Sequence, residues 1–112
     1  MKSKRIYLAC PYAHDDPRIR AHRVDTANRY AAMFMDQGYR VFSPLSHSTT
    51  IAPHCKPNEN KHDYWMKQDL WILTMCDEMF VLCLDGWMES KGLKDEIELA
   101  TLKNIPIGYI TL

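Results

Sequence analysis

Short apolar segments alternate with helical patterns along this sequence, and this alternation restricts the fold more than any other feature. Strands are expected at residues 5–9, 39–42, 78–84 and 105–111, and helical periodicity covers residues 15–37, 63–76 and 90–103. The strand at 78–84 is apolar throughout, as is typical of a strand that is buried on both faces. Strands that alternate with helices form a parallel sheet with right-handed crossovers. The sequence therefore predicts a flavodoxin-like or Rossmann-like three-layer α/β/α fold with a four- to five-stranded parallel sheet.

The ends of the predicted elements carry capping and turn residues. Asp16 and Pro17 are typical of a helix start, and Gly38 is typical of a helix end. Residues 43–62 contain three prolines and three histidines, and we interpret them as one long binding loop. A parallel sheet of this kind binds ligands at the carboxyl ends of its strands, beside the point where the strand order reverses. The ligand site is therefore expected at residues 9–13, 43–48 and 85–90.

Length and charge limit the range of partners. The 112 residues fit a single domain, 1–112, and 14 basic residues balance 14 acidic ones. A binder of nucleic acid polymers normally has a strongly basic face, so a small-molecule ligand is expected instead. The sequence lacks an apolar run long enough to cross a membrane, a signal peptide and closely spaced cysteine pairs. These features favour a cytoplasmic protein that does not interact with membranes.

Two acidic residues interrupt apolar helix faces. Asp69 shares a face with Trp65, Ile72 and Cys76, and Glu96 shares a face with Leu93, Ile97 and Ala100. A buried carboxylate costs several kcal/mol unless it is paired or hydrogen-bonded. Either acid alone is compatible with a capped or salt-bridged core residue. Two of them in one small domain favour a functional site.

The start of the last predicted helix has the pattern of an anion site. If Ser90 caps this helix, its hydroxyl and the amides of Lys91 and Gly92 can bind an anion. Glu96 follows six residues later, about 9 Å along the helix axis. This is roughly the distance from the phosphate of a nucleotide to its anomeric carbon. The alternative is an ordinary serine cap followed by a surface glutamate.

Three motifs together resemble the nucleoside 2-deoxyribosyltransferase superfamily. They are residues 7–12 (YLACPY), residues 68–70 (QDL) followed by 76–77 (CD), and the spacing Ser90-x-Gly92-x3-Glu96-x3-Ala100. The functional spacing is most similar to that of the 2'-deoxynucleoside 5'-monophosphate N-glycosidases. Residues 42–47 (FSPLSH) and 85–87 (DGW) also resemble an uncharacterised, partly phage-borne subfamily (DUF1937-like) with the same fold. The likeness covers nearly the whole chain, and its specificity comes from the joint spacing of short motifs.

The resemblance implies roles for individual residues. Glu96 matches the nucleophile that attacks the anomeric carbon and forms a glycosyl ester, and Tyr7 matches the tyrosine that orients it. Asp69 matches an aspartate beside the base and the reacting centre, where it can carry a proton to the departing base. Ser90 matches a serine that binds the 5'-phosphate in the hydrolases, where the transferases have an aspartate that contacts the 5'-hydroxyl. The resemblance thus favours hydrolysis of a nucleoside monophosphate, without a cofactor, by a homodimer or larger homo-oligomer.

The first loop departs from the hydrolase pattern. Pro11 and Ala13 stand where the hydrolases have a serine and an arginine that contact the phosphate, and Cys10 replaces a glycine. Arg18 or Arg20 is a candidate to supply the missing positive charge. Base exchange by a transferase, and nucleotide binding without turnover, therefore remain alternatives.

Other polar and aromatic residues have two possible roles each. His47 is either a substrate contact or a residue that fixes its loop, and Trp87 either stacks on a base or packs on Trp65 or Trp71. Tyr12 is a candidate for the base pocket. Asp77 is assigned a structural capping role. The histidines and Cys55 lack zinc-type spacing, so no metal site is predicted.

Overall fold

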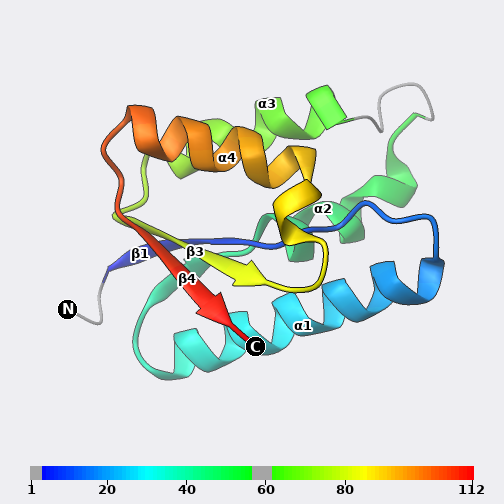
Figure 1. Ribbon diagram of the computed structural model, residues 1–112, viewed down its shortest axis with the longest axis horizontal. Coiled ribbons are helices and arrows are strands. Elements are labelled where there is room, and N and C mark those ends of the chain that lie inside the picture. The colour runs from blue at the N-terminus through cyan, green and yellow to red at the C-terminus, as the bar shows by residue number, and fades with distance from the viewer. Residues whose placement is uncertain (1–3, 57–61) are drawn as a thin grey trace.

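The computed structural model describes residues 4–56 and 62–112, and its elements alternate as the sequence predicts (Figure 1). The strands are β1 (Arg5–Ala9), β2 (Arg40–Phe42), β3 (Glu78–Cys83) and β4 (Ile107–Thr111). The helices are α1 (Pro17–Asp36), α2 (Pro44–Ile51), α3 (His62–Leu73) and α4 (Lys91–Leu102), with short 3-10 helices η1 (Ala52–His54) and η3 (Trp87–Glu89). The sheet has the strand order β2-β1-β3-β4, and all of its neighbouring strands are parallel. The predicted α/β fold with a four-stranded parallel sheet is therefore confirmed.

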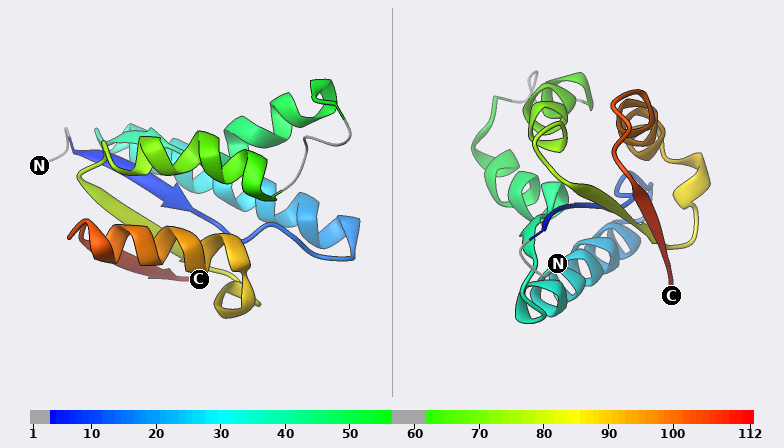
Figure 2. Two further views of the ribbon diagram at one scale, coloured as in Figure 1. Left: turned by 90° about the horizontal axis from the view of Figure 1, so that it is seen from above. Right: turned by 90° about the vertical axis from the view of Figure 1, so that its left-hand side faces the viewer.

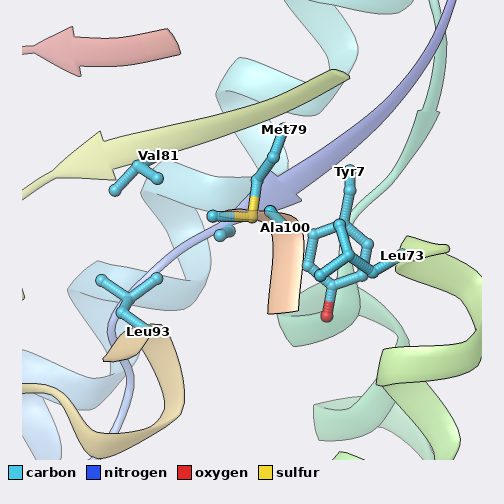
Figure 3. Close-up of a cluster of buried hydrophobic side chains, with 7 residues drawn as sticks. Tyr7, Leu73, Met79, Val81, Leu93 and Ala100 are labelled. Carbon is cyan, nitrogen blue, oxygen red and sulfur yellow. The ribbon is translucent and has the colours of Figure 1, made fainter. Parts of the chain in front are cut away.

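Helices cover both faces of the sheet. Figure 2 shows α3 and α4 on one face and α1 on the other, with α2 beside α1. Tyr7 and Ala9 point to the α3 and α4 side, and Leu8 belongs to a second cluster with α1 and α2. Figure 3 shows the first cluster, in which Tyr7 and Leu73 pack together. The alternation of side chains along β1 thus divides the core into two layers.

The predicted start and end of the first helix are confirmed. The Oδ1 atom of Asp16 accepts a hydrogen bond from the backbone N–H of Arg18 at 2.8 Å, and Pro17 occupies the first turn. Gly38 follows the helix with a φ of 99°, a conformation that favours glycine. The buried face of α1 carries Ala27, Ala31 and Phe34.

The prediction of one long loop over residues 43–62 is wrong for its first half. Ser43 caps α2 by accepting a hydrogen bond from the backbone N–H of Ser46, and Pro44 occupies the first turn. The Ser-Pro pair that follows β2 is thus a helix start. Residues 57–61 of the predicted loop lie outside the described residues. Of the remainder, residues 52–54 form η1, residues 55 and 56 lie in no helix or strand, and His62 starts α3.

The strand order reverses between β1 and β3, because β2 lies on one side of β1 and β4 lies on the far side of β3.

Asp77, just before β3, ties the amino ends of β1 and β3 together. Its carboxylate accepts hydrogen bonds from the backbone N–H of Arg5 at 2.8 Å and from the Arg5 guanidinium at 3.0 Å. These bonds lower the pKa of Asp77 to about 2. Asp77 therefore has the structural role expected of it, as a tie between strands instead of a helix cap.

Candidate active site

Glu96 lies on the buried face of α4 and is held by a tyrosine of the central strand. Leu93, Glu96 and Ala100 are the buried residues of α4, as the apolar stripe predicts. The hydroxyl of Tyr7, which is completely buried, donates a short hydrogen bond to Oε2 of Glu96. Burial raises the pKa of Glu96 to about 8, although the hydrogen bond from Tyr7 opposes this shift. Glu96 is thus a carboxyl group that Tyr7 positions and whose protonated form burial favours.

Asp69 lies on α3 and is 4% exposed. Within residues 4–56 and 62–112, its Oδ1 is the only buried side-chain nitrogen or oxygen without a hydrogen-bond partner in the protein. Burial raises the pKa of Asp69 to about 6, and the nearby His47 opposes this shift. An unpaired buried carboxyl oxygen is costly, so this atom is free to interact with a ligand.

Both carboxyl groups line one cavity of about 880 Å³. Its walls come from the carboxyl end of β1, from α2 and η1, and from α3 and the start of α4. This is the edge of the sheet where the strand order reverses, as predicted from the element order. The volume falls within the range of small-molecule sites, which is about 300–1,000 Å³.

The amino end of α4 forms one side of the cavity. Ser90 caps this helix by accepting a hydrogen bond from the backbone N–H of Leu93 at 3.2 Å, and its hydroxyl hydrogen stays available as a donor. Ser90, Lys91 and Gly92 all line the cavity. A Cβ at Gly92 would lie 3.8 Å from Cε1 of His62 and 3.9 Å from Oγ of Ser90. Glycine leaves this space open between the serine hydroxyl and the imidazole.

A family model described as a domain of unknown function, DUF1937, matches residues 4–110. The chain belongs to the DUF1937 family. The chain is also similar to a solved structure of the 2-deoxyribosyltransferase from the psychrotolerant bacterium Bacillus psychrosaccharolyticus, with a TM-score of 0.69 and 18% sequence identity. This similarity covers 96% of the DUF1937 chain and 72% of the other protein, and it confirms the predicted deoxyribosyltransferase-like fold. No curated protein matches the chain in sequence.

The first loop of the DUF1937 chain reaches the cavity in part. Cys10, Tyr12 and Ala13 line it, and Tyr12 is 39% exposed. The Cys10 thiol contacts the carbonyl oxygens of Pro11 and Arg23, and burial raises the pKa of Cys10 to about 12. Pro11 is buried and does not line the cavity, so it shapes the loop without being placed to touch a ligand.

Besides Pro11, three of the predicted binding residues do not line the cavity. His47 is exposed and packs against Phe42, while Leu45 and Ser48 of the same helix line the cavity; it is still close enough to Asp69 to oppose the rise of that pKa. Trp87 packs against Tyr109 of the edge strand β4, since η3 directs its ring toward this strand.

Arg18 is the third of these residues outside the cavity lining. It forms an ion pair with its own helix cap, Asp16, and its side chain is 91% exposed. Arg20, the other cation considered for the phosphate, donates to the backbone carbonyls of His14 and Asp15. Neither arginine lines the cavity, because local polar groups already hold both.

Arg23 is a buried cation that sequence reasoning missed. It is 6% exposed and donates hydrogen bonds to the carbonyl oxygens of Ala13 at 3.0 Å and Asp85 at 2.7 Å. These bonds join the loop after β1 to the loop after β3, and both loops lead into the cavity wall. A signal existed, because Arg23 precedes Ala27 and Ala31 at intervals of four on the buried face of α1.

His62 and Lys91 also line the cavity, although we considered His62 only as a metal ligand. The Nε2 atom of His62 donates a hydrogen bond to Oδ2 of Asp95 at 2.8 Å, and Nζ of Lys91 lies 3.4 Å from the same oxygen. Across the part of the chain that the structure describes, no three His, Cys, Asp or Glu side chains gather closely enough to hold a metal ion. None of the described helices is long and apolar enough to cross a membrane.

Proposed function

We propose that this protein hydrolyses the N-glycosidic bond of a nucleoside 5'-monophosphate, or of its 2'-deoxy form, and releases the free base and the sugar phosphate. The observation that carries this proposal is the buried Glu96, which receives the hydroxyl hydrogen of Tyr7 on the wall of the cavity that Asp69 also lines. The arrangement fits a retaining glycosidase, in which one carboxylate attacks the sugar and a second group moves protons. The fold that the chain shares with a 2-deoxyribosyltransferase is consistent with this chemistry.

Glu96 attacks the anomeric carbon in the first step. Its carboxylate oxygen forms a bond to C1' while the bond from C1' to the base breaks, and the electron pair of that bond leaves with the base nitrogen. The hydrogen bond from Tyr7 stabilises the ionised form of Glu96 and fixes its orientation. The positive charge that develops on the sugar ring favours ionised Glu96 further.

The two carboxyl groups together hold one proton near neutral pH, because burial raises the pKa of Asp69 to about 6 and that of Glu96 to about 8. When the substrate binds, this proton passes to Asp69, and Asp69 donates it to the departing base. In the second step, water attacks C1', the ester bond breaks, and Asp69 accepts the proton of the water. Glu96 is released as a carboxylate, so the pair ends with the same single proton.

Base exchange is the second candidate function, and the transferase fold of the similar structure favours it. In that reaction, a second base attacks the glycosyl ester in place of water. Ser90 supports the hydrolase, because a hydroxyl donor at the amino end of α4 suits a phosphate better than an aspartate would.

The test is base release from a panel of nucleoside 5'-monophosphates and their nucleosides, in the ribose and deoxyribose forms. We expect wild-type protein to release base from monophosphates and Glu96→Gln to lose at least about a thousandfold in rate. Base release by Glu96→Gln at the wild-type rate would show that Glu96 is not the nucleophile. A second free base in the assay distinguishes a transferase, which alone makes the new nucleoside.

A further inference from the structure

The proposed substrate carries a phosphate, but the first loop supplies no cation to bind it. Arg18 and Arg20 are held by local groups away from the cavity, and Arg23 is occupied by two backbone carbonyls. Ala13 lines the cavity without a polar side chain. A phosphate bound near Ser90 therefore needs a positive charge from another part of the fold.

Lys91 of α4 and His62 of α3 are the basic side chains of these helices that line the cavity. The carboxylate of Asp95 contacts both of them, with distances of 2.8 Å to His62 Nε2 and 3.4 Å to Lys91 Nζ. The imidazole lies next to Gly92, because its Cε1 is 3.8 Å from the position of a Cβ there. The His62–Asp95–Lys91 cluster thus adjoins the capping hydroxyl and the first amides of α4.

The burial of Asp69 indicates independently that this cavity takes a ligand. Asp69 lines the same cavity as the cluster, is 4% exposed, and has an Oδ1 atom without a hydrogen-bond partner in the described residues. A ligand that spans from Asp69 to Ser90 would place its reacting end at the two carboxyl groups and its other end at the cluster. The amides at the start of α4 and the macrodipole of the helix favour a negative charge at that end.

The charges of the cluster also fit a phosphate. With His62 protonated, Lys91 and His62 carry two positive charges against the one negative charge of Asp95, and the excess can pair with a phosphomonoester. Asp95 orients His62 through the contact at 2.8 Å, which lowers the entropy lost on binding, whereas Lys91 is 74% exposed and can swing toward a ligand. Glu89, the remaining acidic residue at this side of the cavity, is exposed to solvent, which screens its charge.

We propose that Lys91 and His62, oriented by Asp95, bind the 5'-phosphate of the substrate together with the Ser90 hydroxyl and the first amides of α4. This inference rests on the proposed function, because it assigns the phosphate of that substrate to a subsite. The positive charge that the resembling hydrolases place in the first loop thus comes from α3 and α4 in this chain.

The test is calorimetric binding of 2-deoxyribose 5-phosphate, 2-deoxyribose and inorganic phosphate to four variants and the wild type. Lys91→Met and His62→Gln should each weaken binding of the sugar phosphate by about tenfold to a hundredfold, as expected when a charged hydrogen bond is lost. Lys91→Arg should restore most of the affinity because it keeps the charge. Lys94→Met is the matched control, since Lys94 is exposed on the same helix and does not line the cavity, and it should bind as the wild type does.

Three results would overturn the subsite. They are unchanged affinity in both Lys91→Met and His62→Gln, equal weakening in Lys94→Met, and binding of 2-deoxyribose as tight as that of the sugar phosphate. The base-release assay on wild-type protein separates this inference from the proposed reaction. Binding of the sugar phosphate without base release would reject the reaction and keep the subsite. Base release at equal rates from nucleosides and monophosphates would keep glycosidic cleavage and reject the phosphate subsite.

Discussion

Both faces of the sheet bury charged side chains, but the two faces differ in whether the protein supplies hydrogen-bond partners for them. On the α1 face, Arg23 gives hydrogen bonds to two backbone carbonyls and joins two loops. On the α3 and α4 face, Asp69 keeps a buried oxygen without a partner, and Glu96 is held only by the Tyr7 hydroxyl among the side chains described. A satisfied buried charge stabilises the architecture, whereas an unsatisfied one costs stability that a ligand can recover. This contrast distinguishes the structural residue from the residues proposed for chemistry.

The largest expected effect is on activity, in Asp69→Asn. This change removes the proton donor, so base release should fall by about a hundredfold to ten-thousandfold, the usual contribution of a general acid. The free energy of unfolding should not fall, because the replaced oxygen has no partner within the protein. Kinetic assays and urea denaturation on the same sample measure both quantities. Full activity, or a stability loss equal to that of a core substitution, would remove Asp69 from the proposed site.

The opposite result is expected for Arg23→Met. The carbonyls of Ala13 and Asp85 lose a charged donor, so the free energy of unfolding should fall by about 2–4 kcal/mol. Arg29→Met is the matched control on the same helix, where an exposed pair with Asp25 is worth less than about 1 kcal/mol. Urea denaturation of both variants tests the difference. Equal stabilities would show that the bonds of Arg23 contribute nothing net.

The fold could be predicted from the sequence because its signals are local. Apolar runs, an Asp-Pro helix start and a glycine stop identify β1, α1 and β3 to within about two residues. Helix α2 was not predicted, because its start, Ser43-Pro44, has the same residues as a turn and its remaining sequence is rich in serine and threonine. The helical backbone bond from the His47 N–H to the carbonyl oxygen of Ser43, at 3.1 Å, decides between the two.

The candidate site could be predicted only in part. Asp69 and Glu96 stood out because a charge on an apolar stripe breaks a periodic pattern, and their shared cavity follows from the strand order. The partners of Arg23 and His62 could not be predicted, since Arg23 meets a residue 62 positions away and His62 one 33 positions away. Spacing also could not show that Trp87 and Arg18 do not line the cavity, because side-chain direction depends on packing.

A smaller effect on stability is expected at Gly86, where the backbone approaches the side chain of Arg23. Gly86 has a φ of 85°, and a Cβ there would lie 3.0 Å from Nη2 of Arg23. Gly86→Ala should therefore lower the free energy of unfolding by about 1–2 kcal/mol through backbone strain, with a further loss if Arg23 shifts. Gly92→Ala is the matched comparison, because a Cβ there meets ordinary contact distances of 3.8 and 3.9 Å. Thermal unfolding should show no loss for Gly92→Ala, and equal losses in the two variants would contradict the Arg23 contact.

The last expected effect is the pH dependence of stability on the carboxylate face. The pKa of Glu96 is raised to about 8 in the folded protein, so folding favours its protonated form. The stability that this preference contributes is fully present below the ordinary glutamate pKa and is lost as the pH rises through about 8. Glu96→Gln stays neutral and can still accept the hydrogen bond of Tyr7, so its melting temperature should match that of the wild type near pH 5 and exceed it by a few degrees at pH 9. Calorimetric melting across this range measures the difference between the two proteins. A difference that stays constant with pH would mean that Glu96 does not titrate in the folded state, and it would remove the shared proton on which the proposed mechanism depends.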